Sequence, residues 1–271
     1  MIQERLKALR AEMEKRGITV YVVPTADFHE SEYVGDHFKA RKFITGFTGS
    51  AGTAVITLDE AGLWTDGRYF VQAENQLKDS TVTLYRMGEE GVPTVDEFVK
   101  DRLKEGGCLG FDGRVVNGTW GGRLEKIAAE KNVSMHVTED LIDLIWEDRP
   151  ALSKQPLFIL EEKYSGKSTA DKIGDLRKAM KENGADVHIL TSLYDIAWLL
   201  NIRGNDIDYV PVVLSYLVLN ETECIWFLQE EVVDDKIRAY LEENHITTKP
   251  YDAIYDLSLI HISEPTRRSY I

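Results

Sequence analysis

Apolar positions near the start of the chain follow a helical period and then change to a continuous run. Residues spaced four, three and four apart fall on one stripe of a helix and are Ile2, Leu6, Leu9 and Met13. Gly17 stands where a left-handed helix cap is expected. The β-branched run from Ile18 to Val23, stopped by Pro24, then predicts a buried strand.

The same order of elements returns in the second half of the chain. Ser168 and Asp171 resemble a capping box, an apolar stripe follows to Met180, Gly184 can cap the helix, and 187–190 is typical of a strand. Four identical pairs are 167 positions apart: Leu9 and Leu176, Arg10 and Arg177, Met13 and Met180, and Gly17 and Gly184. This repeat predicts two structurally similar domains.

A boundary between these domains is indicated by the segment "WEDRPALSKQP". It contains Pro150 and Pro156 with charged residues between them and little periodicity, which is typical of a linker. We therefore expect a first domain over 1–148, a linker over 149–156 and a second domain over 157–256.

The glycine-rich stretch "GFTGSAG", Gly46 to Gly52, raises the question of a phosphate-binding loop. Such a loop requires a strand before it and a helix after it. Here the strand-like "TAVITL" follows, then the turn "DEAG" and the strand-like "LWTDGRYF" with a kink at Gly67. The pattern predicts a hairpin over residues 53–70, with the glycines forming its entry corner.

Other polar clusters also favour structural roles. The segment "YSGKST" lacks the glycine that a Walker motif would place at position 161, where Glu161 stands, so a capped helix start is expected. The segment "DFHESEY" contains one histidine among acidic residues in a loop, which favours hydrogen bonding or helix capping over a metal site. No Ser, Cys or Lys lies in a recognisable nucleophile motif, and we predict no catalytic residue in this chain.

Composition narrows the classes of partner. The 271 residues are 43% hydrophobic and 29% charged, as in a folded globular protein, and the formal net charge is −14. Such acidity disfavours binding to nucleic acid or to an anionic membrane surface.

The sequence also bears on the location of the chain. No apolar run has the length of a membrane-spanning helix, and the charged N-terminus lacks the apolar core of a signal peptide. The two cysteines have no paired spacing. A cytoplasmic location is expected.

Longer motifs resemble a known family. "GFTGSAGTAVIT", "LWTDGRYFVQAE", "VVPTADFHESEYV", "LIWEDRP", "YSGKS" and "DIAWLLNIRGNDIDYVPVVLSY" are similar to aminopeptidase P, the X-prolyl aminopeptidases of the creatinase and prolidase superfamily. The resemblance covers residues 2 to about 256. It implies an α/β fold of two related N-terminal domains, each a mixed sheet flanked by helices, followed in longer members by a "pita-bread" catalytic domain.

The resemblance also implies a chemistry. Family members remove the N-terminal residue from peptides with proline at position two, using two divalent metal ions, usually manganese, held by two Asp, one His and two Glu. These ligands lie in the pita-bread domain, so we expect this chain to bind no cofactor or metal and to be inactive alone. Its domains would shape the substrate entrance and assembly. The partners implied are a proline-containing peptide and, in some members, a second subunit in a homodimer.

One residue of this chain takes a role from the resemblance. The Arg of "WTDGRYF", Arg68, corresponds to a residue that contacts the peptide substrate. A guanidinium can offer a planar fork to a carboxylate or a carbonyl. The alternative is that Arg68 pairs with Asp66 and only fixes the turn.

The last stretch departs from the family. "LSLIHISEPTR", Leu257 to Arg267, resembles a translated sequencing-library adapter, so 257–271 is expected to be a non-native tail and the second domain to be incomplete. An exposed sheet edge and uncovered apolar surface would follow from the incomplete second domain.

The alternative function for this chain is a catalytically inactive creatinase-like module that binds peptides or proteins.

Overall fold

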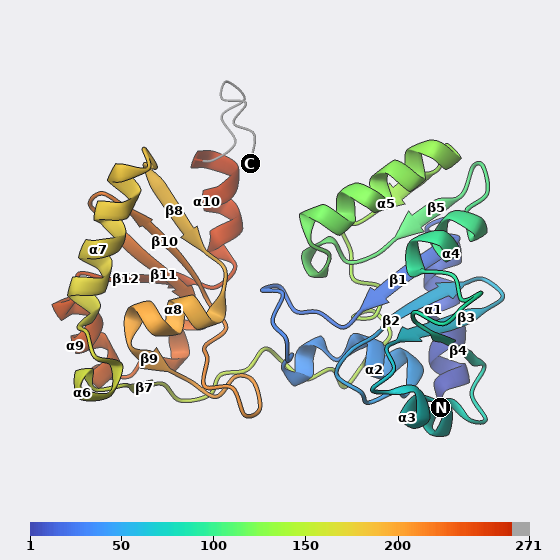
Figure 1. Ribbon diagram of the computed structural model, residues 1–271, viewed down its shortest axis with the longest axis horizontal. Helices are drawn as coiled ribbons and strands as arrows, with labels where there is room; N and C mark the ends of the chain where they lie inside the picture. Colours follow the sequence, from blue (N-terminus) through green and yellow to red (C-terminus); the bar gives the residue numbers. More distant parts are fainter. Residues whose placement is uncertain (262–271) are drawn as a thin grey trace. The chain divides into compact units, whose positions relative to one another are not determined.

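The chain divides into two structural units between Ala151 and Leu152, inside the segment predicted as a linker. The structure is a computed structural model that describes the backbone of residues 1–261 and the side chains of residues 1–257 (Figure 1). The predicted tail therefore lies largely outside the described residues, and its origin stays a prediction.

Unit 1 is built on a six-stranded mixed sheet with the order β4-β3-β2-β1-β5-β6. Its strands are β1 (Val20–Pro24), β2 (Thr53–Thr57), β3 (Ala61–Thr65), β4 (Val82–Arg86), β5 (Cys108–Gly110) and β6 (Ser134–His136). β1 pairs antiparallel with β2, and β2 with β3, while the pairs β3–β4, β1–β5 and β5–β6 are parallel. All five residues of β1 are buried, as the apolar run predicted.

Helices cover both faces of this sheet (Figure 1). They are α1 (Ile2–Lys15), α2 (Ala40–Thr45), α3 (Phe70–Leu77), α4 (Val95–Arg102) and α5 (Gly118–Lys131), with short 3-10 turns at Asp36–Phe38 and Gly113–Val115. Tyr21 and Val23 pack in the core of α1, α2 and α3, whereas Val20 and Val22 pack in the core of α4 and α5. The alternation along β1 explains why the whole strand is apolar.

The predicted hairpin is confirmed in its antiparallel strands, and the predicted end of its second strand is wrong. β2 and β3 pair from Thr53↔Trp64 onwards, but β3 ends at Thr65 and α3 begins at Phe70. The residues between them form a turn, because the Asp66 carboxylate accepts a hydrogen bond from the backbone N–H of Arg68 at 3.0 Å. An Asp side chain commonly stabilises such a turn, and it competes with strand extension here.

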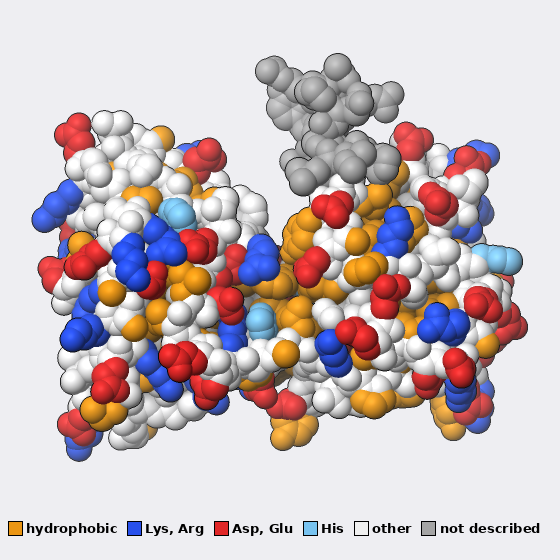
Figure 2. Space-filling model, turned by 180° about the vertical axis from the view of Figure 1, so that it is seen from behind, with side chains coloured by type: hydrophobic (Ala, Val, Ile, Leu, Met, Phe, Trp, Pro, Cys, Tyr) orange, Lys and Arg blue, Asp and Glu red, His pale blue; other side chains and the backbone are white. Residues whose placement is uncertain are grey.

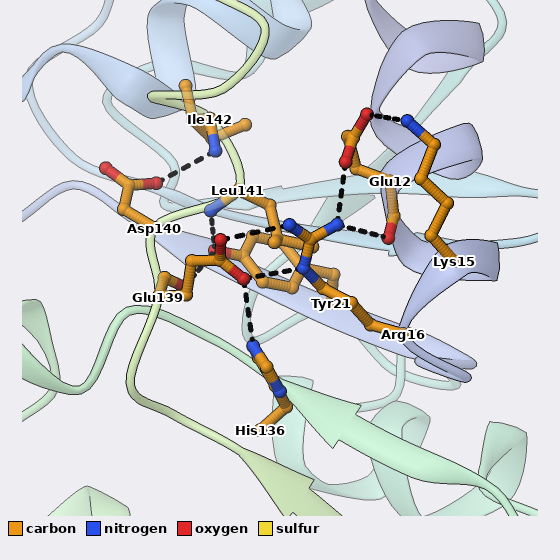
Figure 3. A network of polar contacts seen from close by, with 9 residues as sticks. All are labelled: Glu12, Lys15, Arg16, Tyr21, His136, Glu139, Asp140, Leu141 and Ile142. Atoms are coloured by element: carbon orange, nitrogen blue, oxygen red, sulfur yellow. Dashed lines mark hydrogen bonds and ion pairs between the residues drawn. The ribbon is translucent and has the colours of Figure 1, made fainter.

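A polar network ties the C-terminal segment of unit 1 to its first helix and strand (Figure 3). Arg16 donates two hydrogen bonds to the Glu139 carboxylate, at 2.5 and 2.9 Å, and another to Glu12 at 2.6 Å. The buried Tyr21 hydroxyl accepts a hydrogen bond from the backbone N–H of Leu141 at 2.9 Å. The network fixes the path of the chain after β6.

Unit 2 contains a four-stranded mixed sheet with the order β12-β11-β10-β8, and a two-stranded ribbon of β7 and β9. The strands are β7 (Phe158–Ile159), β8 (Val187–Leu190), β9 (Ile202–Arg203), β10 (Tyr216–Asn220), β11 (Cys224–Leu228) and β12 (Thr247–Pro250). The helices are α6 (Glu162–Ser165), α7 (Thr169–Glu182), α8 (Leu193–Leu200), α9 (Asp235–Glu243) and α10 (Ala253–His261), with a 3-10 turn at Glu230–Val232. β8–β10 and β10–β11 are antiparallel, and β11–β12 is parallel.

The two units repeat one arrangement, which confirms the two related α/β domains predicted from the 167-residue spacing. The series α1-β1-α2-β2-β3-α3-β4 corresponds to α7-β8-α8-β10-β11-α9-β12, with the same strand directions. Gly17 and Gly184 have φ of 67° and 66°. Each glycine follows a helix that closes with the same 2.9 Å backbone hydrogen bond, Ile18 N–H to Met13 O and Ala185 N–H to Met180 O.

Two further observations concern the distribution of charged side chains and the length of the apolar helices. Acidic and basic side chains are interspersed over the face seen in Figure 2. None of the helices within residues 1–261 is long and apolar enough to cross a membrane.

Candidate functional site

The glycine-rich loop 46–52 is organised around a buried arginine. Arg41, on α2, is only 3% exposed. Its guanidinium donates to Thr25 Oγ1 at 2.9 Å, to Phe47 O at 2.6 Å and to Gly49 O, and it lies 4.7 Å from the centre of the Phe47 ring. Burial lowers the pKa of Arg41 to about 10. The loop thus turns carbonyl oxygens toward an internal cation, which supports the structural corner predicted for it.

The loop also contacts the start of α3, directly beside the arginine taken from the family resemblance. Gly49 lies so close to Phe47 and Tyr69 that a Cβ atom there would lie 2.3 and 2.8 Å from their rings. The Ser50 and Tyr69 hydroxyls are 2.6 Å apart, within hydrogen-bond distance. Tyr69 is therefore held from two sides, and it fixes the backbone next to Arg68.

A second set of contacts joins the loop to the exposed side of α3. Thr48 Oγ1 accepts hydrogen bonds from the amides of Gln72 and Gln76 at 2.9 and 2.8 Å. The backbone N–H of Thr48 donates to Gln76 Oε1 at 2.9 Å. These contacts form a polar surface beside the turn that carries Arg68.

Arg68 is held in a fixed orientation and remains open to solvent. Its Nε and Nη2 donate to the two Asp66 carboxylate oxygens, both at 2.9 Å, while its side chain is 70% exposed. The hydrogen bonds to Asp66 raise the pKa of Arg68, and those from Arg68 lower the pKa of Asp66. The pairing is the one that the structural alternative required. The exposed guanidinium leaves a substrate contact open as well, because Nη1 has no acceptor among the described residues.

In the acidic segment after β1, the carboxylate nearest the strand serves the local backbone. Asp27, which is buried, accepts hydrogen bonds from the N–H groups of His29 and Ser31 through Oδ1, both at 2.9 Å. Glu30 accepts a hydrogen bond from Asn117, and Glu32 is exposed. Within residues described by the structure, no group of three or more His, Cys, Asp or Glu side chains could hold a metal ion. The metal ions implied by the resemblance therefore have no ligand set in this part of the chain.

The segment "YSGKST" is also structural. Ser168 is the N-cap of α7 and accepts a hydrogen bond from the backbone N–H of Asp171 at 3.1 Å.

Sequence reasoning missed Arg41. The signal was an arginine three positions before Ile44, on the apolar stripe of a short helix, where a charge must find partners.

Comparisons with known proteins agree with this architecture. The creatinase/prolidase N-terminal domain models match residues 5–145 and 148–269. The chain is 41% identical over 255 residues to a Neurospora crassa protein named "Probable Xaa-Pro aminopeptidase P", and 39% identical over 267 residues to "Aminopeptidase P1" of Lotus japonicus. These matches cover 93% and 97% of this chain, but only 37% and 40% of the relatives. The chain spans about two fifths of the length of these relatives.

A solved structure extends the similarity to three dimensions. The X-prolyl aminopeptidase from Caenorhabditis elegans, described as a cytosolic enzyme with a di-nuclear active site, is 34% identical to this chain. The TM-score is 0.89 over 94% of this chain and 43% of the C. elegans chain. With a family model matched to each of its two units, the chain belongs to the creatinase/prolidase N-terminal domain family.

Proposed function

We propose that this chain forms the two N-terminal domains of a metal-dependent peptidase that removes the first residue from peptides with proline at position two. The observation that carries the proposal is the match to Xaa-Pro aminopeptidases at 41% identity over 93% of this chain, with a coverage of only 37% of the relative. Catalysis would then belong to polypeptide outside this chain. The two units would shape the entrance for the peptide.

Within this proposal, Arg68 contacts the peptide substrate and Asp66 orients it. A guanidinium that is paired through two of its nitrogens is fixed in plane, so less side-chain freedom is lost when a ligand binds. Nη1 is then available to a carbonyl or carboxylate oxygen of the peptide. The polar surface formed by Thr48, Gln72 and Gln76 lies on the adjoining helix and loop.

The metal ions would be held entirely by the catalytic part of the longer protein. They would activate a water molecule as the nucleophile, which is the usual contribution of a dinuclear site. The proposed metal is manganese. The proposed assembly is a homodimer, and the proposed location is the cytoplasm. The description of the C. elegans relative as cytosolic and di-nuclear supports the location and the number of metals.

The test uses the proposed longer protein, this chain joined to a catalytic domain, together with the chain alone. We expect the longer protein, supplied with manganese, to release the first residue from an Xaa-Pro-Xaa peptide and to leave a matched Xaa-Ala-Xaa peptide uncut. The isolated chain should release none. Turnover by the isolated chain would contradict the assignment of catalysis, and a longer protein that cuts neither peptide would contradict the proposed activity.

A further inference from the structure

Unit 1 contains a second polar feature that the proposed function does not use. An open cavity of about 440 Å³ is lined by residues of α1, of the 3-10 turn at Asp36–Phe38, of α2 and of the segment that follows Ile145. Its lining includes Arg5, Asp36, Lys39, Lys42, Phe43, Trp146 and Asp148. A volume of this size is typical of sites for small molecules.

One wall of the cavity is rigid because two aromatic rings are stacked in it. The rings of Phe43 and Trp146 lie 4.6 Å apart with an angle of 13° between their planes. The Arg5 guanidinium lies 4.1 Å from the centre of the Phe43 ring, and its Nη1 donates to Phe43 O at 2.8 Å. Arg5 is therefore held in position by both a ring and a carbonyl oxygen.

This arrangement leaves Arg5 with unused donors. Its Nε and Nη2 have no acceptor among the described residues. A guanidinium that is already ordered and has free donors in the wall of a cavity is suited to an oxyanion, because little further entropy is lost on binding.

The charges around the cavity also favour an anion. Lys39 is paired with Asp36, so these two charges largely offset each other. Lys42 is exposed and has no hydrogen-bond or ion-pair partner in the described part of the chain. Asp148 is the remaining acid, which leaves one more cation than acid in the lining. A net positive cavity is unusual on a chain with a formal charge of −14.

We propose that this cavity is a binding site for a small oxyanion, a carboxylate or a phosphate, that contacts Arg5 and Lys42. The Phe43–Trp146 wall fixes the position of the guanidinium, and Lys42 supplies a second, exposed cation. The site is independent of Arg68, which is on another element, and the inference holds whether or not the chain serves a peptidase.

The test is calorimetric titration of the full chain with succinate and, separately, with inorganic phosphate, at constant ionic strength. We expect saturable binding of at least one of them with a Kd below about 10 mM. Succinate binding alone would identify a carboxylate site, and phosphate binding alone would identify a phosphate site. The Trp146 indole N–H resonance should shift in parallel with the heat.

Three variants decide whether the measured binding belongs to the cavity. Lys42→Gln should weaken binding about threefold to tenfold, and Arg5→Gln by about tenfold or more. Lys7→Gln removes the same charge from an exposed position on α1 that does not line the cavity, and it should change nothing. The Lys42 side chain makes no hydrogen bond or ion pair with the described residues, so its variant remains informative even if Arg5→Gln is unstable. Binding of neither anion below 10 mM, or equal affinity of Lys42→Gln and the unchanged chain, would overturn the proposal.

Discussion

Arg10 and Arg177 make the same hydrogen bond in the two units. Arg10 Nε donates to Thr57 O at 2.9 Å, and Arg177 Nε donates to Asn220 O at 3.0 Å. Thr57 ends β2 and Asn220 ends β10, so each arginine joins one of the equivalent helices α1 and α7 to the turn of the equivalent hairpin. The likeness of the units therefore extends from strand order to individual side-chain contacts.

The two glycine caps should respond alike to substitution. Gly17 and Gly184 have positive φ, and no atom lies within 4 Å of the position that a Cβ atom would take. An alanine there would therefore cause backbone strain without a steric clash. We expect Gly17→Ala to destabilise unit 1, and Gly184→Ala to destabilise unit 2, by about 1 kcal/mol each. Hydrogen exchange measured by mass spectrometry can follow each unit separately.

Gly174→Ala is the matched control. Gly174 lies inside α7, has an ordinary helical φ and also has free space around it. This substitution should stabilise unit 2 by about 0.5–1 kcal/mol, because alanine is the better helix former. The same loss at all three glycines would show that the caps have no special conformational role.

The sequence could predict the elements that are set by local period, and it could not predict those set by distant partners. Leu9, Met13 and Gly17 specify a helix and its cap within one stretch of chain, and they were predicted correctly. The end of β3 is a separate, local error: the turn of Asp66 and Arg68, two positions apart, ends a stretch that was predicted as strand from its strand-like residues. The partners of Arg41 lie before and after it in the chain, so its role in the glycine loop appears only in the folded structure.

Burial of Arg41 leads to a prediction for stability. Arg41→Met should destabilise unit 1 by about 3 kcal/mol, because it leaves the carbonyl oxygens of Phe47 and Gly49 without this donor. Lys42→Met, at the next and exposed position, should change stability by less than about 0.5 kcal/mol. Urea denaturation measures both. A loss below about 1 kcal/mol for Arg41→Met would mean that water or a shift of the loop can replace the guanidinium.

The repeat also exposes a difference between the two sheets. Val20 and Val187 are equivalent residues, 167 positions apart, at the starts of β1 and β8. β5 pairs with β1, and Val20 is completely buried, whereas β8 is an edge strand in the described sheet and Val187 is 47% exposed. Hydrophobic side chains gather on the visible face of unit 2 (Figure 2).

The same substitution at these two positions should therefore have different effects. Val20→Thr places a hydroxyl in the core and should cost about 1–3 kcal/mol, while Val187→Thr should cost less than about 0.5 kcal/mol. Val187→Thr should also reduce binding of a hydrophobic dye by the chain, because it removes exposed apolar surface. Equal destabilisation by the two variants in urea denaturation would show that the β8 edge is covered in solution.

Acid should weaken unit 1 through His37. His37 Nδ1 lies 2.7 Å from Pro150 O and must donate to it, since a carbonyl only accepts. Burial lowers the pKa of His37 from 6.5 and Arg149 lowers it further, while the hydrogen bond to Pro150 O and the charges of Asp143 and Asp140 oppose the shift. A lowered folded-state pKa means that the neutral ring is favoured in the fold, so its stabilising contribution is present above pH 6.5 and is lost as the pH falls through the folded pKa.

A variant separates this effect from that of the carboxylates. His37→Asn keeps a side-chain N–H donor and removes the titration. Between pH 7 and pH 5, the free energy of unfolding of unit 1 should fall more for the original chain than for His37→Asn. An equal fall in both proteins would assign the acid sensitivity to other groups.

Arg68 supplies the prediction that bears most directly on the proposed function, and the longer protein is needed to test it. Arg68→Gln should lower kcat/KM for an Xaa-Pro peptide by about tenfold or more, because a charged hydrogen bond to the peptide is lost. Arg68→Lys keeps the charge without the fork and should recover only part of this loss. Asp66→Asn leaves Arg68 in place but weakens its orientation, so the effect of this variant should be smaller and should appear mainly in KM.

The control is Lys78→Gln, because Lys78 is an exposed charge just beyond α3. This variant should leave kcat/KM unchanged. If Arg68→Gln changes kcat/KM by less than twofold while the fold is intact, the Asp66–Arg68 pair serves only the turn.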